Sequence, residues 1–389
     1  MHFVSHLLPW LIPAAWLLRV LEALRYLPTV PNLLLPEHDV TPAGAPSVTV
    51  IVPARNEGDN VRACLESLLA QDYPNLRIIA VNDRSTDATG AIMESLAGPT
   101  LTVVHITELP PLWLGKTHAM AHAALLASSD YLLFTDADIL FAPSAIRRAL
   151  GSAQASDADH FVLAPTTIIR RWDEAALLAF FQIFGLWAAR PWKVADPKAP
   201  DAIGIGAFNL LRTSAYQQIG GFEALRMEVV EDLALARRVK RFGLRQRFAF
   251  GLDLVRVHWA AGVPGLISVM TKNIFAAVRF HISLLLMGCG WLACFCVLPW
   301  FAIWSRPLAL PAGVTVAAII AAYRLMSPRT GLTAWNALLA PFAASLFIYA
   351  LLRSMVVTLV QGGVNWRGTF YPLRTLRENA APLFPRKGN

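Results

Sequence analysis

Residues 48–57 read VTVIVPARNE, a run of β-branched side chains that ends in a proline and is followed by polar residues. Such a run predicts a short buried strand, with the polar residues at its carboxyl end. The pattern recurs along the chain. Further strands are expected at 77–81, 101–105 and 131–135, and helices at about 59–70, after Asp83 and at 116–127. Strands that alternate with helices predict an α/β domain with a mostly parallel sheet and right-handed crossovers.

The composition indicates that another part of the chain lies in lipid. Of 389 residues, 56% are hydrophobic and only 15% are charged, whereas soluble domains carry about 25% charged residues. Most acidic residues fall within 47–260, and none falls within 282–352. Residues 282–304 carry no charge and are long enough as a helix to cross a hydrocarbon core of about 30 Å. Residues 308–323 and 334–352 are further candidates for membrane helices.

These patterns divide the chain into six segments. They are an N-terminal membrane segment (1–27), a Pro-rich linker (28–46), the α/β domain (47–260), an amphipathic helix at the membrane surface (261–281), transmembrane helices (282–361) and a basic C-terminal tail (362–389). A cleaved signal peptide is the alternative for the first segment. It is disfavoured because no Lys or Arg precedes the apolar run.

Basic residues beside the apolar segments bear on topology. Arg19 and Arg25 favour a cytoplasmic α/β domain. Three crossings after that domain would leave the tail outside, yet the basic residues near the end of the chain favour the cytoplasm: Arg353, Arg367, Arg374, Arg377, Arg386 and Lys387. Either one candidate helix is re-entrant or interfacial, or the tail lies outside. The net charge of +8 is not arranged as a basic stripe with aromatic residues, so nucleic acid is not an expected partner.

Acidic residues follow several predicted strands, where ligands of parallel sheets bind. Glu57 follows the first strand, Asp83 follows the second, and Asp136 and Asp138 follow the strand at 131–135. Two carboxylates at this spacing can hold Mg²⁺ or Mn²⁺ against a diphosphate. Turn and helix-cap formation is the alternative explanation for such residues.

Four more residues are candidates for chemistry. Glu231-Asp232 could supply a general base, although acids are also favoured in the first turn of a helix. Lys116 could contact a phosphate or lie on the surface. His258 could ligate a metal, contact a phosphate or serve as a hydrogen-bonded structural histidine.

The ordered set VTVIVPARNE, VNDRSTD, GK, DAD, GGF and ED resembles family 2 glycosyltransferases with the GT-A fold, over 47–260. The wider layout, with PPLWLGKTHA, KNIFAA and NWRGTFYP, resembles the membrane glycosyltransferases associated with hopanoid biosynthesis. The resemblance implies an inverting transfer from a nucleotide sugar. On the donor side, the resemblance assigns Pro53, Glu57 and Asp83 to nucleotide binding and Lys116 to the donor phosphates. It assigns Asp136 to the ribose or the metal, and Asp138 to the metal. On the acceptor side it places Gly221, Phe222 and Glu231, with Asp232 as the general base.

We therefore expect a membrane-bound transferase that uses a UDP-sugar and a lipid acceptor, in hopanoid biosynthesis, with its domain on the cytoplasmic face of a bacterial-type inner membrane. The Q/RxxRW motif of processive members is absent, since the aligned residues 270–275 read MTKNIF. A polymer-extruding synthase is accordingly disfavoured. A transferase acting on polyprenyl phosphate, or a catalytically silent membrane scaffold that keeps the fold, remains an alternative.

Overall fold

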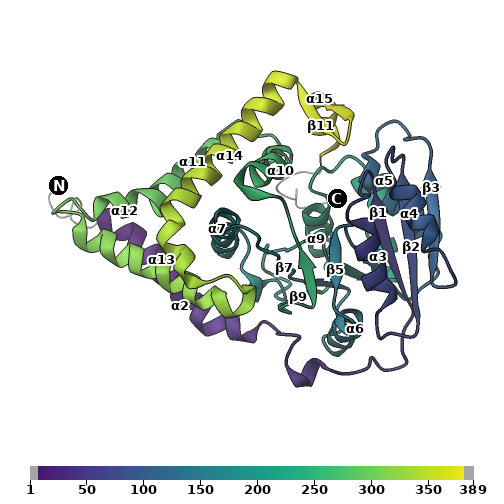
Figure 1. Cartoon of the computed structure of the whole chain (residues 1–389). Coiled ribbons are helices and arrows are strands. Elements are labelled where there is room, and N and C mark those ends of the chain that lie inside the picture. The colour runs from purple at the N-terminus through teal and green to yellow at the C-terminus, as the bar shows by residue number, and fades with distance from the viewer. Residues whose placement is uncertain (1–7, 381–389) are drawn as a thin grey trace.

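The computed structural model describes residues 8–380. The first residues of the N-terminal segment and the end of the basic tail, with Arg386 and Lys387, lie outside the described residues. Figure 1 shows an α/β domain at one end and long helices at the other, with the C-terminal segment returning toward the domain.

The domain is built on a seven-stranded sheet of order β3-β2-β1-β4-β8-β6-β9. The strands are β1 (Val48–Ala54), β2 (Leu76–Asp83), β3 (Leu101–Ile106), β4 (Tyr131–Phe134), β6 (His160–Leu163), β8 (Asn209–Arg212) and β9 (Gln246–Ala249). Only β8 runs antiparallel to its neighbours β4 and β6. The predicted mostly parallel sheet is confirmed, and its first three strands follow the predicted positions closely.

Alternate residues of β1 enter different cores because successive side chains of a strand point to opposite faces. Val50 and Val52 pack in one apolar cluster, and Ile51 packs in another. All seven residues of β1 are buried, which explains its continuous β-branched sequence. The helices of the domain are α3 (Val61–Leu69), α4 (Thr89–Ser95), α5 (Gly115–Leu125), α6 (Ala145–Ala155), α7 (Trp172–Ala188), α8 (Thr213–Gln218) and α9 (Glu231–Arg241).

A small second sheet continues the chain beyond β4. It consists of β5 (Ile139–Phe141), β10 (Val255–Val257) and β7 (Thr166–Thr167), in the order β5-β10-β7. In the antiparallel pairing of β10 with β5, Val257 lies opposite Ile139. This pairing brings the last strand of the domain, β10, beside the residues that follow Asp136-Ala137-Asp138.

Apolar helices form the other region. They are α2 (Leu11–Tyr26), α10 (Gly262–Ala277), α11 (Ile282–Leu292), α12 (Leu298–Ala302), α13 (Ala309–Thr330) and α14 (Ala340–Gln361), with a π-helical turn at Ala293–Val297 and a 3₁₀ segment at Ala334–Leu339. Within residues 8–380, three stretches are long and apolar enough to cross a membrane: Ile282–Ala302, Ala309–Thr330 and Ala334–Gln361. The second and third run further than the sequence indicated.

The helical region and the domain share one apolar cluster. Helix α2 packs on α13, while α10 and the domain helix α7 both pack on α14. Phe180 of α7, Phe275 of α10 and Phe347 of α14 are all buried in this cluster. The α/β domain is thus joined to the apolar helices by a continuous core as well as by the chain.

The predicted basic tail contains ordered structure. Strands β11 (Gly363–Trp366) and β12 (Thr369–Pro372) form an antiparallel hairpin, followed by α15 (Leu373–Asn379). Arg367 and Gly368 form its turn with φ of +50° and +77°, the left-handed conformation of a two-residue hairpin. Tyr371 and Leu376 are buried, so the hairpin and α15 pack against the rest of the molecule.

The stretch 28–46, expected as a linker, packs along the domain. The N–H of Leu33 donates to the carbonyl of Phe250 at 2.8 Å, and the Leu33 carbonyl accepts from Arg148 Nη1 at 2.7 Å. Leu33 is 0% exposed, whereas the neighbouring Leu34 is 43% exposed. One leucine of this pair is therefore a core residue and the other is not.

We predict that Leu33→Ala lowers the free energy of unfolding by about 2–5 kcal/mol, because it leaves a cavity in the core. Leu34→Ala, the matched control, should change it by less than about 0.5 kcal/mol. Thermal unfolding of both variants in detergent measures the difference. Equal midpoints for the two variants would show that this stretch is a linker without a structural role.

Candidate active site

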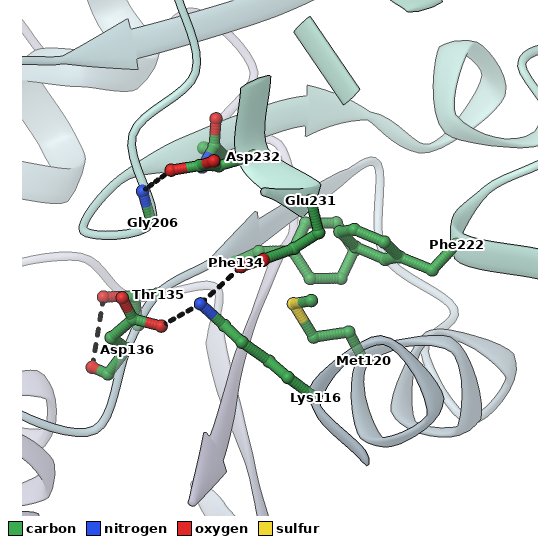
Figure 2. Close-up of a pocket in the computed structure, with 10 residues that line it drawn as sticks. Lys116, Met120, Phe134, Thr135, Asp136, Gly206, Phe222, Glu231 and Asp232 are labelled. Atoms are coloured by element: carbon green, nitrogen blue, oxygen red, sulfur yellow. Dashed lines mark hydrogen bonds and ion pairs between the residues drawn. The ribbon is translucent and has the colours of Figure 1, made fainter. Parts of the chain in front are cut away.

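A pocket opens beyond the end of β4, between α5 and α9. Figure 2 shows the side chains that line it. They are Lys116, Met120, Phe134, Thr135, Asp136, Gly206, Asn209, Phe222, Glu231 and Asp232. The structure thus brings together five of the residues expected from the sequence, from segments that are far apart along the chain: Lys116, Asp136, Phe222, Glu231 and Asp232.

Lys116 lies at the centre of this group. Its Nζ is 2.5 Å from Asp136 Oδ1 and 2.5 Å from Glu231 Oε1, as Figure 2 shows. Burial alone would lower the pKa of Lys116, but the two carboxylates outweigh burial and raise the pKa above its ordinary value. The side chain therefore stays cationic and ties the end of β4 to the first turn of α9.

A glycine loop holds Asp136 and Asp232 on either side. The N–H of Asp136 donates to the Gly206 carbonyl at 3.1 Å, and the N–H of Gly206 donates to Asp232 Oδ2 at 2.9 Å. A Cβ at position 206 would lie 2.5 Å from Asp136 Oδ2, so no larger residue fits without displacing that carboxylate. Gly206 is a site residue that the sequence analysis did not identify.

Asp232 has the electrostatics of a base that titrates near neutral pH. Burial, followed by the charge of Glu231, raises the pKa of Asp232 to about 7. Its Oδ1 accepts from the N–H of Leu233 at 2.7 Å, a bond at the N-terminus of α9 that limits the rise. Figure 2 shows Asp232 directed at the Gly206 loop, while Glu231 reaches Lys116. The two acids are neighbours in sequence, but their side chains contact different parts of the pocket.

Glu57 and Asp83, expected on the donor side, lie at neighbouring strand ends. Pro53 of β1 pairs with Val81 of β2, so the polar residues after both strands meet at one edge of the sheet. Asp83 is buried, and its Oδ1 accepts from Arg84 Nε at 2.7 Å. Glu57 Oε2 accepts from Asn60 Nδ2 at 3.2 Å. Their roles toward a nucleotide stay predictions.

The candidate metal residues Asp136 and Asp138 lie beside this edge. Burial, then the charges of Asp136 and Glu57, raises the pKa of Asp138 to about 7, and a cation beside it would favour its charged form. Within residues 8–380, no group of three or more His, Cys, Asp and Glu side chains could hold a metal ion. Two carboxylates still fit Mg²⁺, which commonly takes one or two protein carboxylates and completes its shell with substrate phosphates and water.

His258 lies next to the β10–β5 pairing. Since Val257 is opposite Ile139, one further position along this register would bring His258 opposite Asp138. In the structure His258 Nε2 is 3.6 Å from Glu174 Oε2. Glu174 also accepts from the N–H groups of Arg170 and Gly262, at 2.9 and 2.7 Å. A metal-ligand role for His258 stays a prediction.

Gly221 and Phe222, expected on the acceptor side, sit against Tyr216. Gly221 has φ of +53°, and a Cβ there would lie 2.6 Å from the Tyr216 ring. The N–H of Phe222 donates to the Tyr216 hydroxyl at 3.0 Å. The Phe222 ring meets Phe134 edge-on, with centroids 4.9 Å apart. This packing fixes the apolar side of the pocket.

The C-terminal hairpin contributes contacts that the sequence analysis did not anticipate. Arg367 Nη1 donates to the Arg55 carbonyl at 2.7 Å, and the guanidinium forms an ion pair with Glu57. The hydroxyl of Tyr371 accepts from the N–H of Gly115 at 3.4 Å, beside Lys116. The sequence pattern of this segment is NWRGTFYP, at residues 365–372, which belongs to the resemblance to the hopanoid-associated enzymes.

Comparison with known proteins agrees with this geometry. Residues 49–220 match the family described as Glycosyl transferase family 2. These residues therefore carry a family 2 glycosyl transferase domain, which lies within the α/β domain. The predicted family resemblance is confirmed at this level, while membership of the hopanoid-associated subgroup stays a prediction.

Two known proteins similar to this chain extend the comparison. The chain is 26% identical over 191 residues to a 4,4'-diaponeurosporenoate glycosyltransferase of Staphylococcus aureus (strain USA300), which covers 49% of this chain and 50% of that protein. The chain thus spans about half the length of the curated relatives it matches. A mannosyltransferase from Pyrobaculum calidifontis, PcManGT, was solved in complex with GDP-Man and Mn²⁺. It superposes with a TM-score of 0.51 at 20% identity, over 89% of this chain and 95% of that one. The superposition confirms the predicted GT-A-like fold.

We predict that Lys116→Gln destabilises the glycosyl transferase domain by about 2–3 kcal/mol, mainly because the buried Glu231 carboxylate loses its cation, while Asp136 is partly exposed to water. Lys116→Arg should cost less, since it keeps the charge. Adding Glu231→Gln to Lys116→Gln should recover part of the loss. Thermal unfolding of the variants measures these effects. An unchanged midpoint for Lys116→Gln would contradict a structural role for the bridge.

Proposed function

We propose that this protein is a membrane-bound inverting glycosyltransferase that transfers a sugar from a nucleotide-diphosphate sugar to a lipid acceptor. The observation that carries the proposal is the pocket of the family 2 domain, where Lys116, Asp136 and Glu231 form one ionic cluster with Asp232 beside it. The shared apolar core with α10 and α14 supports a lipid as the acceptor.

The donor would bind along the ends of β1 and β2. Glu57 and Asp83 would contact the nucleotide, and Lys116 would face the diphosphate. A divalent cation held by Asp138 with Asp136 would supply positive charge against the leaving diphosphate, and we propose Mg²⁺ or Mn²⁺. The Mn²⁺ and GDP-Man bound to the Pyrobaculum calidifontis protein support the same donor chemistry. We propose a UDP-sugar first, with GDP-sugars as the alternative to test.

Asp232 would act as the general base. Its carboxylate would take the proton from the acceptor O–H as that oxygen attacks the anomeric carbon of the sugar. The bond from the anomeric carbon to the diphosphate oxygen would break, and the nucleoside diphosphate would leave with the bonding electron pair. Attack opposite the leaving group would invert the configuration. Lys116 would hold the diphosphate and keep the reacting groups in line.

The hairpin contacts bear on membrane topology. Arg367 contacts Arg55 and Glu57 of the domain, so residues 363–372 lie on the same side of any membrane as the domain. An even number of complete crossings would then separate Val257 from Gly363. This supports the view that one of the three candidate stretches does not cross fully. We propose that domain and hairpin lie on the cytoplasmic face of a bacterial-type inner membrane, with a hopanoid lipid as the first acceptor to test and polyprenyl phosphate as the alternative.

The first test uses membranes that contain the protein, a panel of labelled UDP- and GDP-sugars, and Mg²⁺ or Mn²⁺. We expect label in the organic extract, and mass spectrometry of the product would name both substrates. Asp232→Asn should lower the rate by about 10²- to 10⁴-fold, because the general base is lost. The matched control is Asp253→Asn, at an exposed aspartate. No Asp232-dependent label with any donor would instead favour a catalytically silent scaffold.

The pKa of Asp232 also predicts a pH dependence. A carboxyl group with its pKa raised to about 7 is protonated, and therefore inactive as a base, below that pH. We expect kcat/KM to fall about tenfold per pH unit below pH 7 and to level off above about pH 8. The residual activity of Asp232→Asn should not follow this curve. A wild-type rate that stays constant down to pH 5 would show that Asp232 is not the titrating base.

A further inference from the structure

A lysine outside the family 2 domain lies close to its acidic pocket. Lys272 is on α10, and its Nζ is 3.7 Å from the centroid of the Trp366 ring on β11. Among residues 8–380, Lys272 forms no ion pair with a carboxylate, and its side chain is partly buried. A cation that has lost part of its water and meets only a ring face is a good partner for an anion.

The contact with Trp366 places Lys272 beside the site, because the next residue of the hairpin, Arg367, binds Arg55 and Glu57. Burial lowers the pKa of Lys272 to about 8, while the charges of Glu231 and Asp136 act in the opposite direction. Lys116 and Arg367 lower that pKa further. Lys116 is already bonded to Asp136 and Glu231, and Arg367 is bonded to Glu57. Lys272 is thus the member of this group of cations whose charge is not matched by an adjacent carboxylate.

The position of Lys272 relates it to the membrane side of the pocket. Helix α10 packs along α14, and Trp366 packs against the apolar cluster that both helices share. Figure 1 shows α10 between the domain and the long helices, with the β11 hairpin beside it. Trp366 is followed by Arg367, which binds Arg55 and Glu57 at the end of β1. Lys272 and Trp366 therefore lie where the apolar helices border the edge of the sheet.

We propose that Lys272 and Trp366 bind the anionic head group, a phosphate, of the lipid acceptor and position its remaining O–H beside Asp232. The inference rests on the proposed function and favours polyprenyl phosphate, the alternative acceptor named there, over lipids without an anionic head group. The ammonium would form a charge-assisted hydrogen bond to the anion. The indole would supply a flat apolar wall for the first carbons of the lipid and keep Lys272 in place. Lys272 is a positioning residue, because it would bind the acceptor without taking part in proton transfer.

The test compares two lipids that differ only in charge, polyprenyl phosphate and the corresponding polyprenol, in the same mixed micelles with the full-length protein. Wild type should use polyprenyl phosphate at a lower KM than polyprenol. Lys272→Gln should raise KM for polyprenyl phosphate about tenfold or more, the expected effect of losing a charged hydrogen bond. It should remove the preference for the charged lipid and leave the Kd for UDP or GDP unchanged.

Three further variants sharpen the comparison. Lys272→Arg should keep most of the preference, because it keeps the charge. Trp366→Leu should raise KM for both lipids, since it removes the wall that both would contact. Arg374→Gln, which removes an exposed cation from the same C-terminal segment, is the matched control and should behave as wild type.

Two results would overturn the inference while leaving the proposed function intact. One is a weaker Kd for UDP or GDP in Lys272→Gln with no change in KM for the lipid, which would assign Lys272 to the donor diphosphate. The other is a wild-type enzyme that does not distinguish polyprenyl phosphate from polyprenol. If wild type glycosylates no lipid, the proposed function fails. Equilibrium binding of labelled polyprenyl phosphate then tests the inference separately, and equal binding by wild type and Lys272→Gln would reject it.

Discussion

The ion-pair cluster around Lys116 is the interaction on which the rest of the pocket depends. Asp136, Glu231 and Asp232 converge in one pocket, where the carboxylates repel one another and burial disfavours the charged form of Asp232. A single ammonium, 2.5 Å from both Asp136 and Glu231, offsets this repulsion. It leaves Asp232 without a direct cation, which is why the pKa of Asp232 stays raised to about 7. Lys116 thus binds Asp136 and Glu231 directly, and Asp232 is the acid that it does not bind.

The second constraint is the joint between the family 2 domain and the apolar helices. Helix α7 belongs to the domain but packs on α14, and the β11–β12 hairpin follows α14 but contacts the ends of β1 and α5. The edge of the sheet that carries the acidic residues is therefore bordered by segments from the helical region. Under the proposed function, this edge is where the nucleotide donor and the lipid acceptor would meet.

Much of the domain could be predicted from the sequence because its signals are local. The β-branched run at 48–52 and its counterpart in β2 indicate buried strands, since each strand is covered on both faces. The charge-free run from Ile282 indicates a membrane helix for a similarly local reason, because such a length has few other uses. The hairpin at 363–372 escaped prediction because two four-residue strands give almost no periodic signal. Its place is set by Arg367 and Glu57, which lie 310 positions apart.

For the candidate site, too, some features follow from the sequence and others from the tertiary structure. The sequence by itself determined the candidate residues, and five of them, Lys116, Asp136, Phe222, Glu231 and Asp232, line one pocket. Only the tertiary structure decided that Lys116 binds Glu231 rather than Asp232, that Gly206 separates the two aspartates, and that Lys272 meets Trp366. Strand and helix patterns follow from side chains a few positions apart. Ion pairs and ring contacts depend on how distant segments pack, and no local pattern specifies that.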